Sequence, residues 1–258
     1  MAAKKKVLAK VIEQKELSLG IYDLWIETEL AANAVCGQFI GLYPWDKSHL
    51  LPRPISICEV DKSKGQLRLV YRVQGEGTKE FSCLKKGDKI QILGILGNGF
   101  PVLEGKGKPV LLMGGGIGIP PMLQLAKELE AESYITLGYR NNQLFLKEEF
   151  EAYGTVYVAT QDGSVGTKGN VMDAVIEHGI EVHVIYACGP LPMLGAIKAY
   201  AAKKGIPAYL SLEERMACGV GACLGCVCKT TSMDHHSHVN NARICTEGPV
   251  FLGDHITI

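Results

Sequence analysis

The chain has 258 residues, of which 47% are hydrophobic and 7% aromatic, a composition typical of an ordinary core rich in aliphatic residues. This length is sufficient for two domains and a small extension. Its 27 Lys and Arg residues balance 27 Asp and Glu residues, so no overall electrostatic field would attract nucleic acid or an anionic membrane. We therefore expect a protein that binds neither.

The first segment, residues 1–101, is predicted to form a barrel. Short β-rich runs are separated by turn residues, and alternation of apolar and polar residues in Leu24–Glu29 and Leu67–Val73 indicates half-buried strands. Six such strands with little helix in about ninety residues favour a small closed antiparallel barrel of Greek-key type, because closure removes exposed edges. The expected strands are Val7–Glu13, Ile21–Glu27, Gln38–Tyr43, Ile55–Val60, Gln66–Val73 and Lys89–Leu96.

Two segments of this barrel carry residues suited to a phosphate-containing ligand. Arg53-Pro54-Ile55-Ser56 combines a guanidinium with a hydroxyl on a segment that proline keeps extended. Gly75-Glu-Gly77-Thr78 precedes an expected short helix, Lys79–Leu84, whose first N–H groups would be free to bind a phosphate. Taken alone, each motif is equally compatible with a surface salt-bridging arginine and an ordinary turn.

Residues 102–212 alternate between strands and helices. An apolar strand, Pro109–Met113, runs into Gly114-Gly115-Gly116-Ile-Gly118-Ile-Pro-Pro121 and then into a helix that ends near Glu130. This is the order that a dinucleotide-binding unit requires, although Ile119 and Pro121 occupy positions where the G-x-G-x-x-G fingerprint has glycine or alanine. Five nearly continuous apolar strands predict a doubly wound parallel sheet. The other four strands are Tyr134–Tyr139, Thr155–Thr160, Val182–Cys188 and Ala208–Leu212, and the helices are Lys147–Glu151, Val171–His178 and Leu191–Lys204.

Two segments lie at carboxyl ends of these strands, where ligands of such sheets bind. Asp162 is either a turn residue or a carboxylate that accepts from ribose hydroxyls, and no arginine stands beside it in the sequence. A carboxylate there would repel a 2′-phosphate, which favours NAD over NADP. Cys188-Gly189-Pro190 is either core or a segment that approaches the nicotinamide.

The last segment, residues 213–258, contains a cysteine ligand loop. Cys218, Cys223 and Cys226 have the C-x4-C-x2-C spacing of a plant-type 2Fe-2S site, and Cys245 supplies a remote fourth thiolate. Four thiolates around two irons leave no open coordination position, which favours electron transfer over substrate binding. Glycines between the cysteines permit the tight turns that such a loop needs. The segment is therefore predicted to be a small iron-sulfur domain.

Alternatives for this segment stay open. Zinc sites usually pair two short C-x2-C knuckles, whereas the second half here offers one cysteine and the insert Asp234–His238, to which we assign no role. Cys228 has the wrong spacing for the fourth ligand and is expected to be a buried or spare thiol. An odd count of nine cysteines, clustered at ligand spacing, fits a reducing compartment. Because no signal peptide or long apolar span is visible, a cytoplasmic location is expected.

Taken together, these motifs resemble the ferredoxin reductase-like flavoprotein family: R-P-I-S and G-x-G-T in a barrel, G-G-G-I-G-I-P-P opening a nucleotide domain, and C-G-P at a later strand. The appended C-G-V-G-A-C-L-G-C, with a distant R-I-C-T-E-G-P-V-F, is similar to electron-transfer subunits of dihydroorotate dehydrogenase B. The resemblance covers essentially the full chain. One departure is the end of the chain, His255–Ile258, where many members of the wider family carry an aromatic residue that covers the flavin.

The resemblance implies a set of cofactors and their sites. It implies FAD at the barrel, held by Arg53, Pro54, Ile55, Ser56, Val70, Tyr71, Arg72, Gly77 and Thr78. It implies NAD at the second domain, near Gly114, Gly115, Gly116, Gly118, Asp162, Cys188, Gly189 and Pro190. The cluster ligands would be the four cysteines already identified, and no side chain is expected to act as nucleophile or general base.

The resemblance also implies a partner and a pathway. An FMN-containing dihydroorotate dehydrogenase catalytic subunit would pass electrons through the cluster to FAD and then to NAD+, in pyrimidine biosynthesis. A heterotetramer of two catalytic and two electron-transfer chains is expected. One alternative is an NAD(P) reductase subunit of a related hydrogenase or sulfide dehydrogenase complex. Another is a zinc-stabilised nucleotide-binding module without redox activity.

Overall fold

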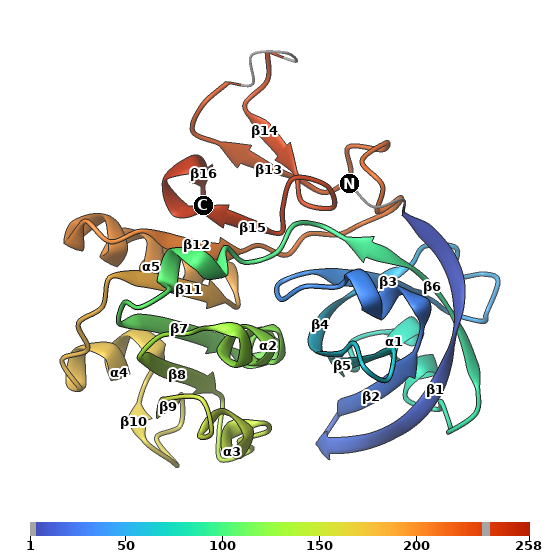
Figure 1. The fold of residues 1–258 in the computed structure, drawn as a ribbon, viewed down its shortest axis with the longest axis horizontal. Helices are drawn as coiled ribbons and strands as arrows, with labels where there is room; N and C mark the ends of the chain where they lie inside the picture. Colours follow the sequence, from blue (N-terminus) through green and yellow to red (C-terminus); the bar gives the residue numbers. More distant parts are fainter. Residues whose placement is uncertain (1–3, 234–237) are drawn as a thin grey trace.

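A computed structural model describes residues 4–233 and 238–258 of the chain. The predicted insert Asp234–His238 therefore lies outside the described residues except for His238. Figure 1 shows three parts: a barrel, a mostly parallel sheet with helices on both faces, and a smaller C-terminal part that lies across the other two. In the described ranges, no helix is long and apolar enough to span a membrane.

The N-terminal part is the predicted six-stranded antiparallel barrel. Its strands are β1 (Lys5–Ser18), β2 (Ile21–Glu27), β3 (Phe39–Tyr43), β4 (Arg53–Asp61), β5 (Gln66–Arg72) and β6 (Lys89–Leu96), and a short 3-10 helix, η1 (Glu29–Asn33), follows β2. The strands close in the order β1-β2-β5-β4-β3-β6. Alternate residues such as Leu24, Ile26, Leu67 and Leu69 fill the interior, and all four are fully buried. The apolar residues that alternate in the sequence are therefore those whose side chains face the interior of the barrel.

The helix of the barrel begins earlier than predicted. Helix α1 spans Glu76–Phe81 rather than Lys79–Leu84, and Gly75 is its N-cap residue. The Thr78 hydroxyl accepts from the backbone N–H groups of Gln74 and Gly75, at 2.9 and 3.2 Å. This side-chain contact satisfies N–H groups at the helix start, so the glycine-containing segment forms the first turn instead of preceding it.

The middle part contains the five predicted parallel strands: β7 (Val110–Gly115), β8 (Ser133–Tyr139), β9 (Thr155–Thr160), β11 (Val184–Cys188) and β12 (Ala208–Ser211). The sheet is larger than predicted, because β10 (Thr167–Lys168) and β15 (Val250–Leu252) extend it to the order β10-β9-β8-β7-β11-β12-β15. Strand β15 is antiparallel to β12. The helical elements are η2 (Val102–Gly105), η3 (Gly116–Gly118), α2 (Pro120–Glu128), α3 (Lys147–Phe150), α4 (Val171–Glu177) and α5 (Leu191–Lys204).

Both faces of this sheet are covered. On β7, Leu112 packs in the same core as Met122 of α2, while Leu111 packs in the core that contains Val171 of α4 and Leu194 of α5. Neighbouring residues of a strand point to opposite faces. The helices therefore lie on both sides, as the doubly wound prediction requires.

The C-terminal part contains a three-stranded sheet of order β14-β13-β16. Its strands are β13 (Val227–Thr230), β14 (Asn241–Arg243) and β16 (Ile256–Thr257), with a 3-10 turn η4 (Gly253–His255) before the last. The division of the chain at residue 213 stays a prediction. The pairing of β15 with β12 means that one strand of the last segment belongs to the middle sheet.

Candidate functional site

The cysteine loop folds back onto the segment that carries Cys245. Gly219, Gly221 and Leu224 have φ angles of 67°, 86° and 56°, in the left-handed region that the tight turns require. The Ile244 N–H donates to the Cys226 carbonyl at 2.9 Å. A side chain on Gly221 would place its Cβ 2.8 Å from the Thr246 side chain, so the two segments approach closely only because this residue is glycine.

The four predicted ligand thiols interact in two pairs. The Cys223 side chain helps to lower the pKa of Cys218, and the neighbouring Cys226 helps to raise the pKa of Cys245, so each of these two thiols lies close to a second one. In the part of the chain that the structure describes, no group of three or more His, Cys, Asp or Glu side chains is placed so that it could hold a metal ion. A 2Fe-2S cluster would take two of the predicted thiolates on each iron.

Backbone N–H groups of the loop point at the sulfurs. The Val220 N–H donates to the Cys218 Sγ and the Gly225 N–H to the Cys223 Sγ, each at 3.4 Å. Burial alone would raise the pKa of Cys218, but N–H groups of the loop outweigh it and lower that pKa to about 6. The pKa of Cys245 is raised to about 11; burial is the largest cause, and the neighbouring Cys226 is the second. The loop therefore contains N–H donors that can stabilise thiolate charge, as ligation to a metal cluster requires.

Cys228 has a different environment. It is half-buried on β13 and lines a pocket of about 460 Å³ between α5 and the small sheet. Burial raises the pKa of its thiol. These features agree with a spare thiol outside the ligand set.

The cluster segment is attached to the end of barrel strand β6. The Gly97 N–H donates to the Cys245 carbonyl at 3.2 Å, and the Asn98 N–H to the Gly248 carbonyl at 2.6 Å. Leu93 and Leu96 of β6 share a buried core with the predicted ligand cysteines Cys226 and Cys245. A cluster held by this loop would consequently be adjacent to the barrel.

The structure brings the two predicted flavin segments together. A Cβ on Gly77 would lie 2.7 Å from the Arg53 Nε, so the guanidinium lies against the first turn of α1. Pro54, Ile55 and Ser56 follow Arg53 along β4 and are half-buried. The Thr78 hydroxyl is engaged by the N–H groups at the start of the helix, as described above.

Two other predicted flavin residues point into the protein. Val70 is 2% exposed and Tyr71 is 1% exposed. The Tyr71 hydroxyl hydrogen-bonds with the Gln14 side chain at 2.9 Å, and its ring stacks on Tyr22. Only the backbone of these two residues is therefore in a position to line a ligand.

The glycine turn of the middle sheet meets both the C-G-P segment and the barrel. A Cβ on Gly118 would lie 2.3 Å from the Cys188 carbonyl oxygen, and one on Gly115 would lie 2.4 Å from the Met193 Sδ. Gly116 has a φ of 55° and approaches the Arg72 guanidinium. A Cβ on Gly116 would lie 3.5 Å from the Arg72 Nη2. Gly114 directly precedes Gly115 in the same glycine run. Gly189 and Pro190 directly follow Cys188. Burial raises the pKa of the Cys188 thiol to about 12, which makes it a poor nucleophile.

Asp162 lies in an exposed turn after β9. Its Oδ1 accepts from the backbone N–H and the hydroxyl of Ser164, at 2.9 and 2.7 Å, and these bonds lower its pKa. Its N–H donates to the carbonyl of Arg140 at 3.3 Å, so the backbone of an arginine adjoins Asp162 in the folded sheet although no arginine stands beside it in the sequence. Arg140 directly follows the neighbouring strand β8, and this adjacency exists only in the folded sheet.

Two charged residues near Arg72, Arg140 and Glu213, are not among those predicted from the sequence. Burial and the charge of Arg140 lower the pKa of Arg72, while Glu213 acts in the opposite direction. The three side chains therefore share one electrostatic environment where the barrel meets the middle sheet. Arg140 directly follows a parallel strand, so the carboxyl-end rule could have identified it.

Comparisons with known proteins agree with this arrangement. Residues 213–257 match the model of the iron-sulfur cluster binding domain of dihydroorotate dehydrogenase B, and residues 112–199 match the oxidoreductase NAD-binding domain. The chain is 44% identical over 254 residues to the dihydroorotate dehydrogenase B (NAD(+)) electron transfer subunit of Listeria monocytogenes serotype 4a, covering 96% of this chain and 98% of that protein. It is 43% identical to the protein of the same description from Lysinibacillus sphaericus, over 94% and 95% of the two chains.

Solved structures are also similar to this chain over most of its length. A chain of an NADH-dependent reduced ferredoxin-NADP oxidoreductase superposes with a TM-score of 0.85 at 28% identity, over 97% of this chain and 90% of that one. A ferredoxin NADP+ reductase from Neisseria gonorrhoeae, solved with bound FAD and NADP, gives 0.66 at 15% identity, over 82% and 94% of the two chains, and shows the fold alone.

Proposed function

The chain belongs to the family of electron transfer subunits of NAD-dependent dihydroorotate dehydrogenase B, and we propose that it carries electrons from a catalytic partner through a 2Fe-2S cluster and FAD to NAD+. Its iron-sulfur and NAD-binding domains make it part of an oxidoreductase in pyrimidine biosynthesis. Family membership decides against the two alternatives, a hydrogenase-type or sulfide dehydrogenase reductase subunit and a zinc-stabilised module without redox activity.

The observation that carries the proposal is the junction between the cluster segment and the barrel. The Gly97 N–H bonds to the carbonyl of the ligand residue Cys245. Phe39 pairs with Ser56 of the predicted flavin strand and packs in the same core as Cys226. A cluster on these cysteines and a flavin on this strand would thus be separated by very few residues, which supports direct electron transfer between them.

The residues of the barrel suit a flavin with a pyrophosphate. Arg53 and the first turn of α1 offer a guanidinium and free N–H groups to phosphate oxygens, since Gly77 allows the guanidinium to approach the helix. When bound, FAD supplies the step that joins two-electron hydride chemistry to one-electron transfer. We expect no side chain of the chain to act as a general base. Its residues bind the cofactors, orient them and set their surroundings.

The partner would meet the cluster at the exposed side of the loop. Cys223 is exposed, and the flanking Val220 and Leu224 are 42% and 61% exposed. Apolar side chains around a redox centre suit a protein interface that excludes water. We infer an FMN-containing catalytic subunit at this surface, in a heterotetramer of two chains of each kind located in the cytoplasm.

The experiment that tests the route uses the isolated chain with its cofactors, under anaerobic conditions. Acid extraction should release FAD, and NADH should bleach the flavin and then produce the paramagnetic signal of a reduced 2Fe-2S cluster. Dihydroorotate should do neither, because we assign to this chain neither a base nor a second flavin site. FMN in the extract, or a cluster that stays oxidised after the flavin is reduced, would contradict the proposed route.

A further inference from the structure

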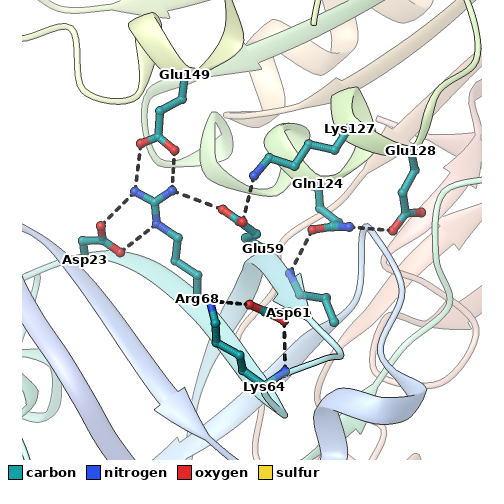
Figure 2. Close-up of polar contacts among 10 residues, drawn as sticks. Asp23, Glu59, Asp61, Lys64, Arg68, Gln124, Lys127, Glu128 and Glu149 are labelled. Atoms are coloured by element: carbon teal, nitrogen blue, oxygen red, sulfur yellow. Dashed lines mark hydrogen bonds and ion pairs between the residues drawn. The ribbon is translucent and has the colours of Figure 1, made fainter. Parts of the chain in front are cut away.

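A buried arginine joins the barrel to the nucleotide domain. Arg68 of β5 has a side chain that is 6% exposed. Its Nε and Nη2 donate to the two carboxylate oxygens of Asp23 on β2, at 2.9 and 2.8 Å. Its Nη2 also donates to Glu149 on α3 at 2.9 Å, and Nη1 donates to the other oxygen of that carboxylate (Figure 2). One guanidinium therefore holds a carboxylate of each domain.

A second set of contacts lies beside it, between β4 and α2. Glu59 of β4 pairs with Lys127 of α2 at 2.8 Å and with Arg68 at 3.4 Å. The Val60 N–H donates to the Gln124 side-chain oxygen at 2.8 Å (Figure 2). Two elements of the nucleotide domain are thus bound to two strands of the barrel.

The charges of this network balance, yet its two halves differ in burial. Arg68, Lys127 and Lys15 face Asp23, Glu59 and Glu149, three charges of each sign. The Asp23 side chain is 1% exposed, whereas that of Glu149 is 41% exposed. If the domains separate, Asp23 still pairs with Arg68 and Glu149 becomes hydrated. Separation therefore leaves no unpaired buried charge, and the contact can be broken at moderate cost.

The elements that carry the network also carry the cofactor motifs. Strand β4 begins with Arg53 and ends beyond Glu59, and β5 continues from Arg68 to Arg72, which approaches the glycine turn at Gly116. Helix α2 starts two residues after that turn. A shift of α2 and α3 against the barrel would move the nucleotide turn relative to the flavin strand.

We propose that Arg68 and Glu149 are positioning residues, which hold the nucleotide domain where the nicotinamide meets the flavin. The inference rests on the proposed function, because it assumes FAD on the barrel and NAD on the second domain. Hydride transfer requires the donor and acceptor atoms to be about 3–3.5 Å apart, and a misplacement of about 1 Å costs on the order of 100-fold in rate. A bidentate contact across the interface supplies orientation as well as attraction.

The test compares Glu149→Gln with Glu148→Gln in the assembled complex with all cofactors. Both variants remove one negative charge from α3, but the Glu148 side chain is exposed. Flavin reduction is measured twice by stopped flow, once with NADH and once with dihydroorotate. The long-wavelength charge-transfer absorbance that arises when a nicotinamide stacks on a flavin, measured at equilibrium, reports how closely the two rings approach, independently of turnover.

Glu149→Gln should slow flavin reduction by NADH at least about tenfold, as expected for a displacement of somewhat less than 1 Å. Reduction by dihydroorotate should be unchanged, because that route uses the cluster and the barrel alone. The charge-transfer absorbance should weaken in Glu149→Gln, while Glu148→Gln should match the wild type in every measurement.

Three outcomes would overturn the proposal. Equal NADH rates in Glu149→Gln and the wild type contradict the positioning role, and so does an equal loss in both half-reactions, which indicates general destabilisation. An unchanged charge-transfer absorbance with a slowed NADH reaction also contradicts it. If NADH fails to reduce the flavin of the wild type, the proposed function itself is wrong.

Discussion

Replacing Gly97 by alanine should loosen the junction between the barrel and the cluster segment. Gly97 has a φ of 75°, and its ideal Cβ would lie 2.5 Å from the Pro249 Cδ, 2.7 Å from the Gly248 carbonyl oxygen and 3.0 Å from the Phe39 ring. The left-handed backbone costs alanine about 1–2 kcal/mol. Overpacking against a proline ring and a carbonyl adds about 1–3 kcal/mol. The free energy of unfolding should therefore fall by about 2–5 kcal/mol.

Gly20 provides a matched control for the backbone contribution. It has a φ of 72°, and nothing lies within 4 Å of its ideal Cβ. Gly20→Ala should lose only the backbone part, about 1–2 kcal/mol. Both variants, with cofactors bound, are unfolded in urea and followed by circular dichroism and by the visible absorbance of the cluster.

The cluster absorbance should disappear at a lower urea concentration in Gly97→Ala than in Gly20→Ala. The physical reason is the bond from the Gly97 N–H to the Cys245 carbonyl, which overpacking would displace. Equal losses in the two variants, or a cluster signal that is unaffected by Gly97→Ala, would refute this account of the junction.

Three further predictions concern the cluster, the interdomain network and the choice of nucleotide. Cys245→Ser should abolish the paramagnetic signal of the cluster, whereas Cys228→Ser should retain it; full retention in Cys245→Ser would remove Cys245 from the ligand set. Partial burial opposes ionisation of Glu149, but the hydrogen bond from Arg68 prevails and lowers its pKa. Glu149 therefore stabilises the fold at pH values above about 4.5, the pKa that it has in the unfolded chain. In urea unfolding, the higher free energy of unfolding of the wild type relative to Glu149→Gln should disappear as the pH falls below that value. Steady-state assays should show a preference for NADH over NADPH that shrinks in Asp162→Ala, and equal wild-type rates with both nucleotides would refute the role of Asp162.

The parts of the fold that could be predicted are those with a local signal. The barrel strands alternate because one face is buried, and the parallel strands β7, β8, β9, β11 and β12 are nearly continuously apolar because helices cover both faces. The cysteine spacing is likewise local. The start of α1 was placed wrongly because the Thr78 side chain, rather than the apolar pattern, determines which residue opens the helix.

The parts that could not be predicted depend on contacts distant in sequence. Arg68 alternates in β5 like any polar residue of a half-exposed strand, yet its partners Asp23 and Glu149 lie 45 and 81 positions away. Strand β15 has three residues, too few for a periodic pattern, and its place is determined by pairing with β12. Arg140 comes beside Asp162 only when β8 and β9 align.

The most direct test of the central claim is reconstitution with an FMN-containing dihydroorotate dehydrogenase catalytic subunit. NADH formation from dihydroorotate and NAD+ is followed for each subunit alone, for the mixture, and for a mixture that contains Cys245→Ser. The account predicts NAD-dependent turnover in the wild-type mixture only. Dihydroorotate oxidation by the isolated chain, failure of the wild-type mixture, or full turnover with the variant that lacks the cluster would contradict it.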